Sequence, residues 1–356
     1  MCVVIMIIYA DKKFEFMEIF NERNGTLIRT DVDGTDPVMR SFPELLDVGI
    51  MGHCNSGEYC KKAGIECYQK GYGVCAPHMS AEHFEMIADQ AMGKTFQIAL
   101  GGAGDPNKHP AFEQILEICR SHKIVPNLTT SGFQITDREI DLIRKYCGAV
   151  AVSWYSRIIN GHESNFATIN SVNRLVLEKC VTNIHFVVST NTIDEAIVRM
   201  EHDLFPSGIN AVVFILYKPV GYGVSDKVLN YCDSRLEMFF RLSTKKKHPY
   251  HIGFDTCFTP AVLQRVDTVP TVSIDSCEAG TFSMYIDSQM NCYPCSFGIW
   301  NADICESMYK QSISDIWFGK TFTEFRERKK TKCISCIHNN LCREGCRLGI
   351  GIDLCR

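Results

Sequence analysis

The sequence predicts a parallel β/α fold followed by a small cysteine-rich domain. Six runs that are apolar on both faces have the length of buried strands, and a helical pattern follows each of them between residues 44 and 245. From about residue 250 this alternation stops and closely spaced cysteines take over. Six strand–helix units fit either an open doubly wound sheet or an incomplete barrel.

The composition is that of a globular protein that does not enter a membrane. The chain has 356 residues, of which 46% are hydrophobic and 22% charged, and its net charge is -4. This charge predicts no general attraction to nucleic acid or to an anionic membrane. The apolar start "MCVVIMIIYA" is too short to span a bilayer and lacks the features of a signal peptide, so we expect a buried edge strand there and a cytoplasmic protein.

The expected elements divide the chain into three parts. Residues 1–43 form a strand and hairpin segment, with the hairpin turn at Asn24-Gly25 in "FNERNGTLIRT". Residues 44–247 form the β/α core, and residues 248–356 form the cysteine-rich domain. The core strands are expected at 44–51, 96–102, 125–131, 149–155, 183–190 and 209–218. Helices are expected at 80–92, 110–122, 136–147, 167–179 and 192–205, with a sixth pattern within 226–247.

Cysteine usage is the abnormal feature of the composition. There are nineteen cysteines, and ten of them lie in the last hundred residues. In an exported chain this density would predict disulfides. In a reducing compartment, clustered thiolates more often bind metal, and that is the interpretation we favour.

Three cysteines lie in the loop that follows the first core strand, in "MGHCNSGEYCKKAGIECYQKG". Cys54, Cys60 and Cys67 would emerge at the carboxyl end of a strand, where the active sites of β/α folds lie. Iron in a four-iron cluster normally takes four protein thiolates, so three leave one iron free to chelate a cofactor.

This loop resembles the signature of the radical SAM family, which has three cysteines, commonly C-x3-C-x2-C, followed by an aromatic residue. Here the spacing is C-x5-C-x6-C, Tyr68 holds the aromatic place, and Cys75 is an alternative ligand. The resemblance implies a partial (βα)6 TIM-type barrel. It also implies a [4Fe-4S] cluster on Cys54, Cys60 and Cys67 that binds S-adenosylmethionine.

The ends of later strands carry further matches to the family. Gly101 and Gly102 in "LGGAGDPNKHP" match the glycine pair whose backbone carbonyls bind the amino group of S-adenosylmethionine, where a Cβ would prevent close approach. The usual glutamate is absent, and an Asp-Pro pair follows slightly later. By the same resemblance, Thr130, Ser131 and Ser153 would contact the ribose and carboxylate of the cofactor.

The C-terminal cysteines resemble the SPASM extension, which carries two auxiliary [4Fe-4S] clusters. The resemblance assigns Cys277, Cys295 and Cys346 to the first auxiliary cluster, and Cys333, Cys336, Cys342 and Cys355 to the second. The fourth position of the first cluster is open between Cys257, Cys292 and no protein ligand. We favour Cys257, because Cys292 fills an apolar strand position. A zinc ribbon is the alternative for this region.

The resemblance implies an enzyme with three [4Fe-4S] clusters. It would reductively cleave S-adenosylmethionine to a 5′-deoxyadenosyl radical, which abstracts hydrogen from a substrate. We expect a ribosomally made precursor peptide in which a thioether or C–C crosslink forms. A sulfatase-maturase-like enzyme and a small-molecule radical SAM dehydrogenase are alternatives, and a non-catalytic zinc-binding interaction protein is the alternative of another class.

The expected partners follow from this chemistry. They are the precursor peptide, an electron donor such as flavodoxin or ferredoxin, and a separate leader-binding protein. Peptide recognition could instead use the barrel rim or the N-terminal hairpin. Asp255, which neighbours Cys257, is the one candidate acid or base, and a helix or loop cap is its alternative role.

Overall fold

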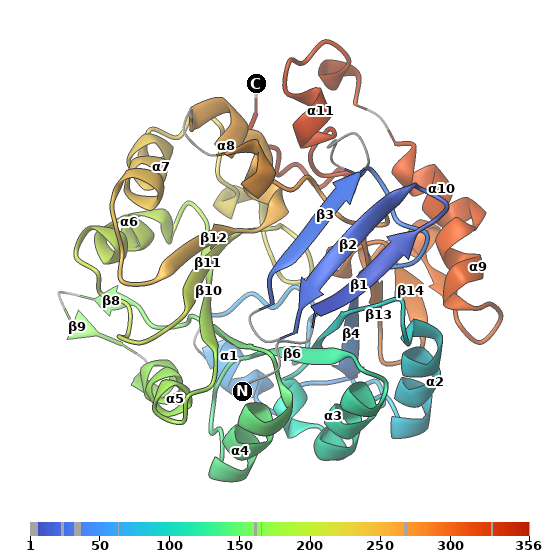
Figure 1. Cartoon of the computed structure of the whole chain (residues 1–356). Coiled ribbons are helices and arrows are strands. Elements are labelled where there is room, and N and C mark those ends of the chain that lie inside the picture. The colour runs from blue at the N-terminus through green and yellow to red at the C-terminus, as the bar shows by residue number, and fades with distance from the viewer. Residues whose placement is uncertain are drawn as a thin grey trace.

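A ten-stranded sheet forms the centre of the protein in the computed structural model, and helices surround it (Figure 1). The structure describes residues 6–22, 25–31, 37–62, 64–159, 162–164, 166–266, 270–328 and 330–355. No helix within these ranges is long and apolar enough to cross a bilayer.

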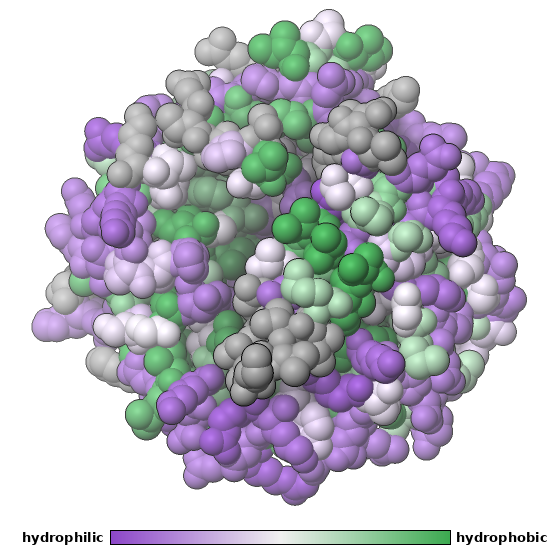
Figure 2. All heavy atoms as spheres, in the orientation of Figure 1, coloured by the Kyte–Doolittle hydropathy of each residue, from purple (hydrophilic) through white to green (hydrophobic). Residues whose placement is uncertain are grey.

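The N-terminal segment forms a separate antiparallel sheet of β1 (Met6–Asp11), β2 (Phe16–Asn21) and β3 (Leu27–Asp31). The hairpin between β2 and β3 is confirmed, although Asn24 of its predicted turn lies outside the described residues, as does Cys2. The prediction that the first strand is buried is wrong. Ile8 is 66% exposed, and with Met6, Met17 and Ile28 it forms an apolar outer face, visible in green over this sheet in Figure 2.

The six predicted core strands are all present, side by side and parallel. They are β4 (Leu45–Met51), β5 (Gln97–Gly102), β6 (Val125–Thr130), β7 (Val150–Ser153), β10 (Thr182–Val188) and β11 (Ala211–Leu216). The helices between and after them are α2 (Ala81–Ala91), α3 (Phe112–Ser121), α4 (Asp137–Tyr146), α5 (Phe166–Leu177), α6 (Ile193–Glu201) and α7 (Arg235–Lys245). The predicted partial (βα)6 barrel is confirmed.

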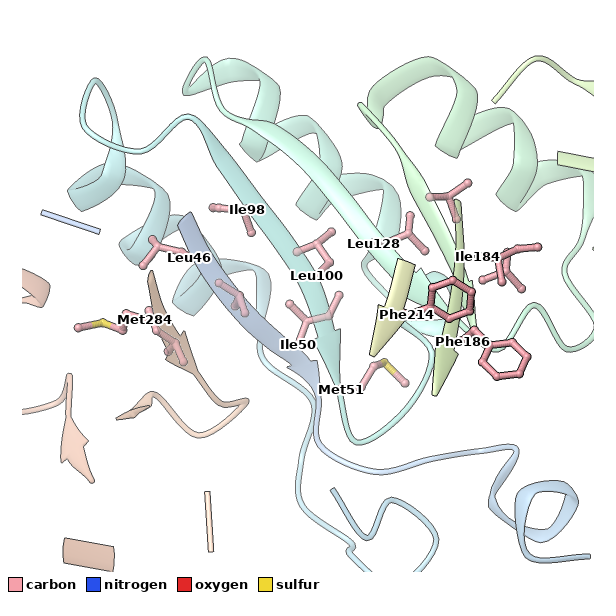
Figure 3. Close-up of a cluster of buried hydrophobic side chains, with 14 of the residues drawn as sticks. Leu46, Ile50, Met51, Ile98, Leu100, Leu128, Ile184, Phe186, Phe214 and Met284 are labelled. Carbon is pink, nitrogen blue, oxygen red and sulfur yellow. The ribbon is translucent and has the colours of Figure 1, made fainter. Parts of the chain in front are cut away.

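Successive side chains along each strand point alternately toward the surrounding helices and toward the barrel interior. On β4, Leu46, Val48 and Ile50 are fully buried toward the helices, as Figure 3 illustrates for this core. Asp47, between them, is only half-buried, because it points to the barrel interior. The interior is therefore accessible and partly polar.

The helices start where the sequence offers capping groups. The hydroxyl of Ser80 accepts the backbone N–H of His83 at the start of α2. Thr136 and Glu139 form a reciprocal capping box at the start of α4.

The C-terminal segment adds strands to both ends of the same sheet. β12 (His251–Phe254) pairs in parallel with β11, and β13 (Ser283–Ile286) pairs in parallel with β4. β14 (Asn291–Tyr293) and β15 (Glu306–Ser307) continue the sheet antiparallel. The remaining elements are β8 (Ile158–Ile159), β9 (His162–Glu163), α1 (Gly57–Lys62), α8 (Thr259–Arg265), α9 (Ile313–Phe318), α10 (Lys320–Arg326) and α11 (Asn339–Cys342). The division at residues 43 and 247 stays a prediction.

Although the strand–helix alternation stops near residue 250, α9 and α10 contribute to a packed core. Trp317, Phe322 and Phe325 are fully buried, the first two within the main core of the barrel. Residues 330–355 are rich in loops, and α11 is the one short α-helix among the described residues there.

A buried ion pair joins the N-terminal sheet to the barrel and to α9. The guanidinium of Arg40 lies 2.8 Å from the carboxylate of Glu18 on β2, and both side chains are fully buried. Arg40 also donates to the carbonyl of Phe42, while its own carbonyl accepts the indole N–H of Trp317. Three segments that are distant in sequence therefore meet at Arg40.

Replacing Arg40 by Leu should lower the free energy of unfolding by about 3–5 kcal/mol, because Glu18 would stay buried without a partner. The Glu18→Leu/Arg40→Leu double variant should lose less than the single variant. Arg144→Leu, at an exposed ion pair, should change stability by only about 0.5 kcal/mol. Urea denaturation measures all three, and a double variant as unstable as the single one would contradict the role assigned to the pair.

Candidate functional site

The structure brings the three thiols of the first cysteine loop together despite their wide spacing. Cys60 lies on α1, with Cys54 before this helix and Cys67 after it. Burial raises the pKa of the Cys60 thiol to about 12, and the adjacent charges of Cys54, Asp105 and Cys67 contribute to the rise. Cys75, the alternative ligand, is exposed and is not among the charges that act on these three thiols.

Close backbone packing holds this loop against the turn after β5. The N–H of Cys54 donates to the carbonyl of Gly71. A Cβ on Gly71 would collide with the carbonyl oxygen of Ala103, and one on Gly104 would lie 3.1 Å from the Cα of Cys54. The cysteine loop and the glycine turn therefore form one unit, which only glycine permits at these contacts.

The two glycines of the predicted cofactor turn differ in what surrounds them. Gly102 has φ +120°, and a Cβ there would lie 2.5 Å from the carbonyl oxygen of Met51. At Gly101 the nearest atom to a Cβ would be a carboxylate oxygen of Asp47, at 3.8 Å. Gly102 is needed to form the turn, whereas Gly101 faces open space in the barrel interior.

The polar strand ends are not equally available to a ligand. The hydroxyl and N–H of Ser131 donate to the two carboxylate oxygens of Asp105, at 2.5 and 2.6 Å. Thr130 is 1% exposed, and its hydroxyl accepts the N–H of Gly132. The structure therefore does not present Thr130 to the interior. Ser153 is half-buried at the end of β7 and does face the interior.

Four interior residues were missed by sequence reasoning. Thr129, rather than Thr130, is the half-buried residue on β6, and Asp47, Tyr155 and His185 also retain access to the interior. Burial raises the pKa of Asp47 to about 7, opposed by a hydrogen bond from Ser296. Burial lowers the pKa of His185 to about 4, so its imidazole is neutral at pH 7. Strict period-two alternation along each strand would have identified these residues.

The C-terminal segment covers the cysteine loop at Tyr68. The ring of Tyr68 lies 4.6 Å from that of Phe297, and the indole N–H of Trp300 donates to the Tyr68 carbonyl. The side-chain amide of Gln69 donates to the hydroxyls of Tyr68 and of Tyr285 on β13. The predicted aromatic position is thus the contact between the two cysteine-bearing regions.

A second set of thiols forms between the barrel and the C-terminal segment. Its members are buried thiols whose charges act on one another, namely Cys257, Cys277, Cys295 and Cys346. Burial raises the pKa of Cys257, and Cys277 and Cys346 add to the rise. Cys292 is buried on β14 and is influenced instead by Asp287, Cys305 and Glu306. The structure therefore brings Cys257, and not Cys292, to this set.

Lys218 is a buried cation beside the second set. Its side chain is 3% exposed, and its ammonium lies 2.5 Å from the carboxylate of Asp255. Burial acts to lower the Lys218 pKa, but attraction by Asp255 and by the thiols of Cys257 and Cys295 raises it overall. The other carboxylate oxygen of Asp255 accepts the N–H of Leu216. Asp255 therefore holds Lys218, and neither this pairing nor its position suits the predicted acid or base role.

The third set of thiols lines a small pocket that is partly open to solvent. Cys333, Cys336, Cys342 and Cys355 all contribute to its wall, and Pro260 and Leu263 of α8 also line it. The ammonium of Lys332 lies 3.3 Å from the sulfur of Cys355. Within the described residues, no three or more His, Cys, Asp or Glu side chains are arranged to hold a single metal ion.

Met290 has a backbone conformation that is unusual for a residue with a side chain. Its φ is +63°, a left-handed conformation that glycine adopts freely. The Met290 side chain is fully buried in the core, so packing offsets part of the backbone strain.

Comparisons with known proteins support the fold and the C-terminal iron-sulfur domain. Residues 277–338 match the SPASM family, described as an iron-sulfur cluster-binding domain. The fold matches that of Streptococcus suis SuiB bound to S-adenosylmethionine, with 15% identity and a TM-score of 0.72 over 98% of this chain and 96% of that one. SuiB has a similar match when bound to the precursor peptide SuiA. Native anSMEcpe with bound AdoMet matches with 17% identity and a TM-score of 0.60 over 86% of this chain and 90% of that one.

No curated protein sequence matches this chain. The predicted resemblance to radical SAM enzymes with a SPASM domain is confirmed, as is the predicted fold class.

Gly102→Ala should destabilise the turn after β5 by about 1–3 kcal/mol, because alanine strains at this φ and its Cβ meets backbone atoms. Gly101→Ala is the matched control and should change stability by only about 0.5 kcal/mol. Thermal unfolding of both variants measures the difference. Equal melting temperatures would show that the close approach at Gly102 is relieved by a small shift of the β4 end.

Proposed function

We propose that this chain is a radical SAM enzyme that modifies a peptide substrate. The observation that carries the proposal is the grouping of Cys54, Cys60 and Cys67 at the carboxyl ends of the strands, directly against the turn of Gly101 and Gly102. Neither feature alone would specify this chemistry, but their contact supports the proposal that a three-thiol cluster site lies beside a cofactor cradle.

The residues present suit the groups that the proposal requires. Burial and mutual repulsion disfavour the thiolate forms of the three cysteines, and bound iron would offset both effects. Three thiolates leave one iron of a four-iron cluster without a protein ligand. Gly101 leaves the barrel side of the turn free for the cofactor amino group. Ser153 and Thr129 supply hydroxyls to the same interior.

A [4Fe-4S] cluster with S-adenosylmethionine supplies, when bound, the electron that yields methionine and a 5′-deoxyadenosyl radical. The chain itself positions the cofactor and covers the site against water. Tyr68, Phe297 and Trp300 form the part of that cover contributed by both cysteine-bearing regions.

A precursor peptide is the proposed substrate, and a thioether or C–C crosslink is the proposed product. Support comes from the likeness to SuiB, which is known in complex with a precursor peptide and matches almost the full chain, including the N-terminal sheet. This support is at the level of the fold. The exposed apolar face formed by Met6, Ile8, Met17 and Ile28 gives the peptide a surface outside the barrel. A separate leader-binding protein would be needed only if this face does not bind the peptide.

The two C-terminal thiol sets are proposed to hold two auxiliary [4Fe-4S] clusters, giving three in all. Cys257, Cys277, Cys295 and Cys346 would bind the first, and Cys333, Cys336, Cys342 and Cys355 the second. Lys218 would balance the negative charge of the first auxiliary cluster. The electron donor is proposed to be a flavodoxin or ferredoxin.

Replacing Cys54, Cys60 and Cys67 together by Ala should remove one of three clusters. Anaerobically reconstituted protein should then hold roughly eight irons instead of roughly twelve. Formation of 5′-deoxyadenosine should cease, because no other site chelates the cofactor. Iron and sulfide analysis with product chromatography provides the test. Stoichiometric zinc with little sulfide would favour the zinc-binding interaction protein, and retained cofactor cleavage in the variant would show that other thiols bind the cluster.

Asp47, rather than Asp255, is proposed to accept the proton that substrate oxidation releases. Its carboxylate lies in the interior next to Gly101, and its pKa of about 7 places its titration near neutral pH. Only the ionised form accepts a proton, so peptide modification should speed up between pH 6 and pH 8. Asp47→Asn should abolish this rise while cofactor cleavage continues. An unchanged pH profile in Asp47→Asn, measured beside Asp255→Asn, would refute the assignment.

A further inference from the structure

The charge of the chain is distributed unevenly, with a basic C-terminal end. Residues 320–356 contain nine Lys and Arg against four Asp and Glu, a net charge of +5, whereas the rest of the chain carries -9. Most of this basic charge flanks the third thiol set, in "RERKKTKC". A local field of one sign attracts partners of the opposite sign and raises their association rate.

Apolar side chains are exposed in the middle of this basic region. Ile334 is 74% exposed and Ile337 is 89% exposed, and the exposed Cys336 lies between them. Arg328 and Lys332 are exposed close by in the chain. We name these five residues the C-terminal surface. Figure 1 shows α11 and the loop before it projecting beyond the ring of helices, and Figure 2 shows apolar side chains at the same projecting end.

The C-terminal surface lies directly over the third thiol set. Cys336 belongs both to the surface and to the wall of the cavity that the four thiols line. Lys332 likewise lines the cavity and lies 3.3 Å from Cys355. A protein that covers Ile334 and Ile337 therefore comes into van der Waals range of a proposed cluster ligand. An apolar centre of two exposed isoleucines with basic residues around it is the arrangement found in small protein–protein interfaces.

We propose that the C-terminal surface docks an acidic protein that carries single electrons. The proposal rests on the proposed function, because it needs a cluster in the cavity of Cys333, Cys336, Cys342 and Cys355. The docked carrier, in its oxidised form, gains one electron from this site and the site loses one. No bond forms or breaks in this transfer, and no proton moves.

The charge and the small size of the C-terminal surface favour an electron carrier over a second copy of this chain or a peptide substrate. Redox encounters use small, electrostatic and short-lived interfaces, as expected of a patch with two apolar residues and a basic rim. A stable dimer of this chain would need a larger apolar area than this patch offers. A peptide substrate has no need to contact a residue at the wall of a cluster site.

The test uses oxidised flavodoxin as the probe and the reduced holoenzyme as the electron source. Stopped-flow absorbance gives the second-order rate constant for flavodoxin reduction at low and high ionic strength. The wild-type rate constant should fall about tenfold at high salt, because screening weakens the steering. The Arg328→Glu/Ile337→Glu variant should be about tenfold slower at low salt. Iron content and the electron paramagnetic resonance spectrum should not change, because both side chains are exposed.

The matched control is Arg138→Glu/Leu177→Glu, which makes the same charge change on exposed residues of α4 and α5. It should keep the wild-type rate within about twofold. Equal slowing in both variants would mean that net charge acts and not the surface, and no slowing in the first would overturn the proposal directly.

The same variants separate the other occupants. Loss of precursor-peptide binding, or of a dimer in sedimentation, with an unchanged flavodoxin rate would assign the surface to the peptide or to a second copy and overturn the proposal. Failure of the wild-type protein to cleave S-adenosylmethionine with a chemical reductant counts against the proposed function alone. The flavodoxin rate does not depend on that cleavage.

Discussion

The grouping of eleven cysteine thiols into three sets, ten of them at least partly buried, is the constraint on which the site depends. Buried thiols resist ionisation, and their like charges repel when they do ionise. A bound cationic cluster offsets the unfavourable free energy of burying several thiolates close together. Cluster binding and folding are therefore coupled wherever the cysteines of one set come from distant segments. The set of Cys257, Cys277, Cys295 and Cys346 joins segments across some ninety residues. It therefore closes the C-terminal segment onto the barrel.

The contacts around Tyr68 and Lys218 explain how the cysteine-bearing regions act as one site. Trp300 and Phe297 fasten the C-terminal segment to the first cysteine loop, and Lys218 extends from the end of β11 to the second thiol set. Because β12 and β13 extend the barrel sheet at opposite ends, the C-terminal segment is built into the same scaffold. The barrel sheet and the C-terminal segment thus form one scaffold, which holds the first two thiol sets.

Much of this arrangement could be predicted from the sequence, and particular residues show where prediction stopped. The six strands, their helices and the hairpin were recognisable because each depends on periodicity or capping within a few residues. Thr129 and Thr130 both offer a hydroxyl at the end of the same strand, so the sequence does not distinguish them as cofactor contacts. Only the position of β6 in the sheet decides which of the two side chains faces the interior. The core around Trp317 was missed because α9 and α10 are short and their apolar residues pack on segments far away in sequence.

The sequence by itself determined the β/α alternation, the cysteine groups within each loop and the glycine turn, since each is a local pattern. Only the tertiary structure decided that Cys257 rather than Cys292 joins the second thiol set, and that Asp255 holds Lys218 instead of standing free. It also decided that Asp47 faces the interior beside Gly101. The physical reason is the same in each case. These neighbours come from strands that pair across the sheet, and strand order and register are set by burial of the whole core, which no short stretch of sequence specifies.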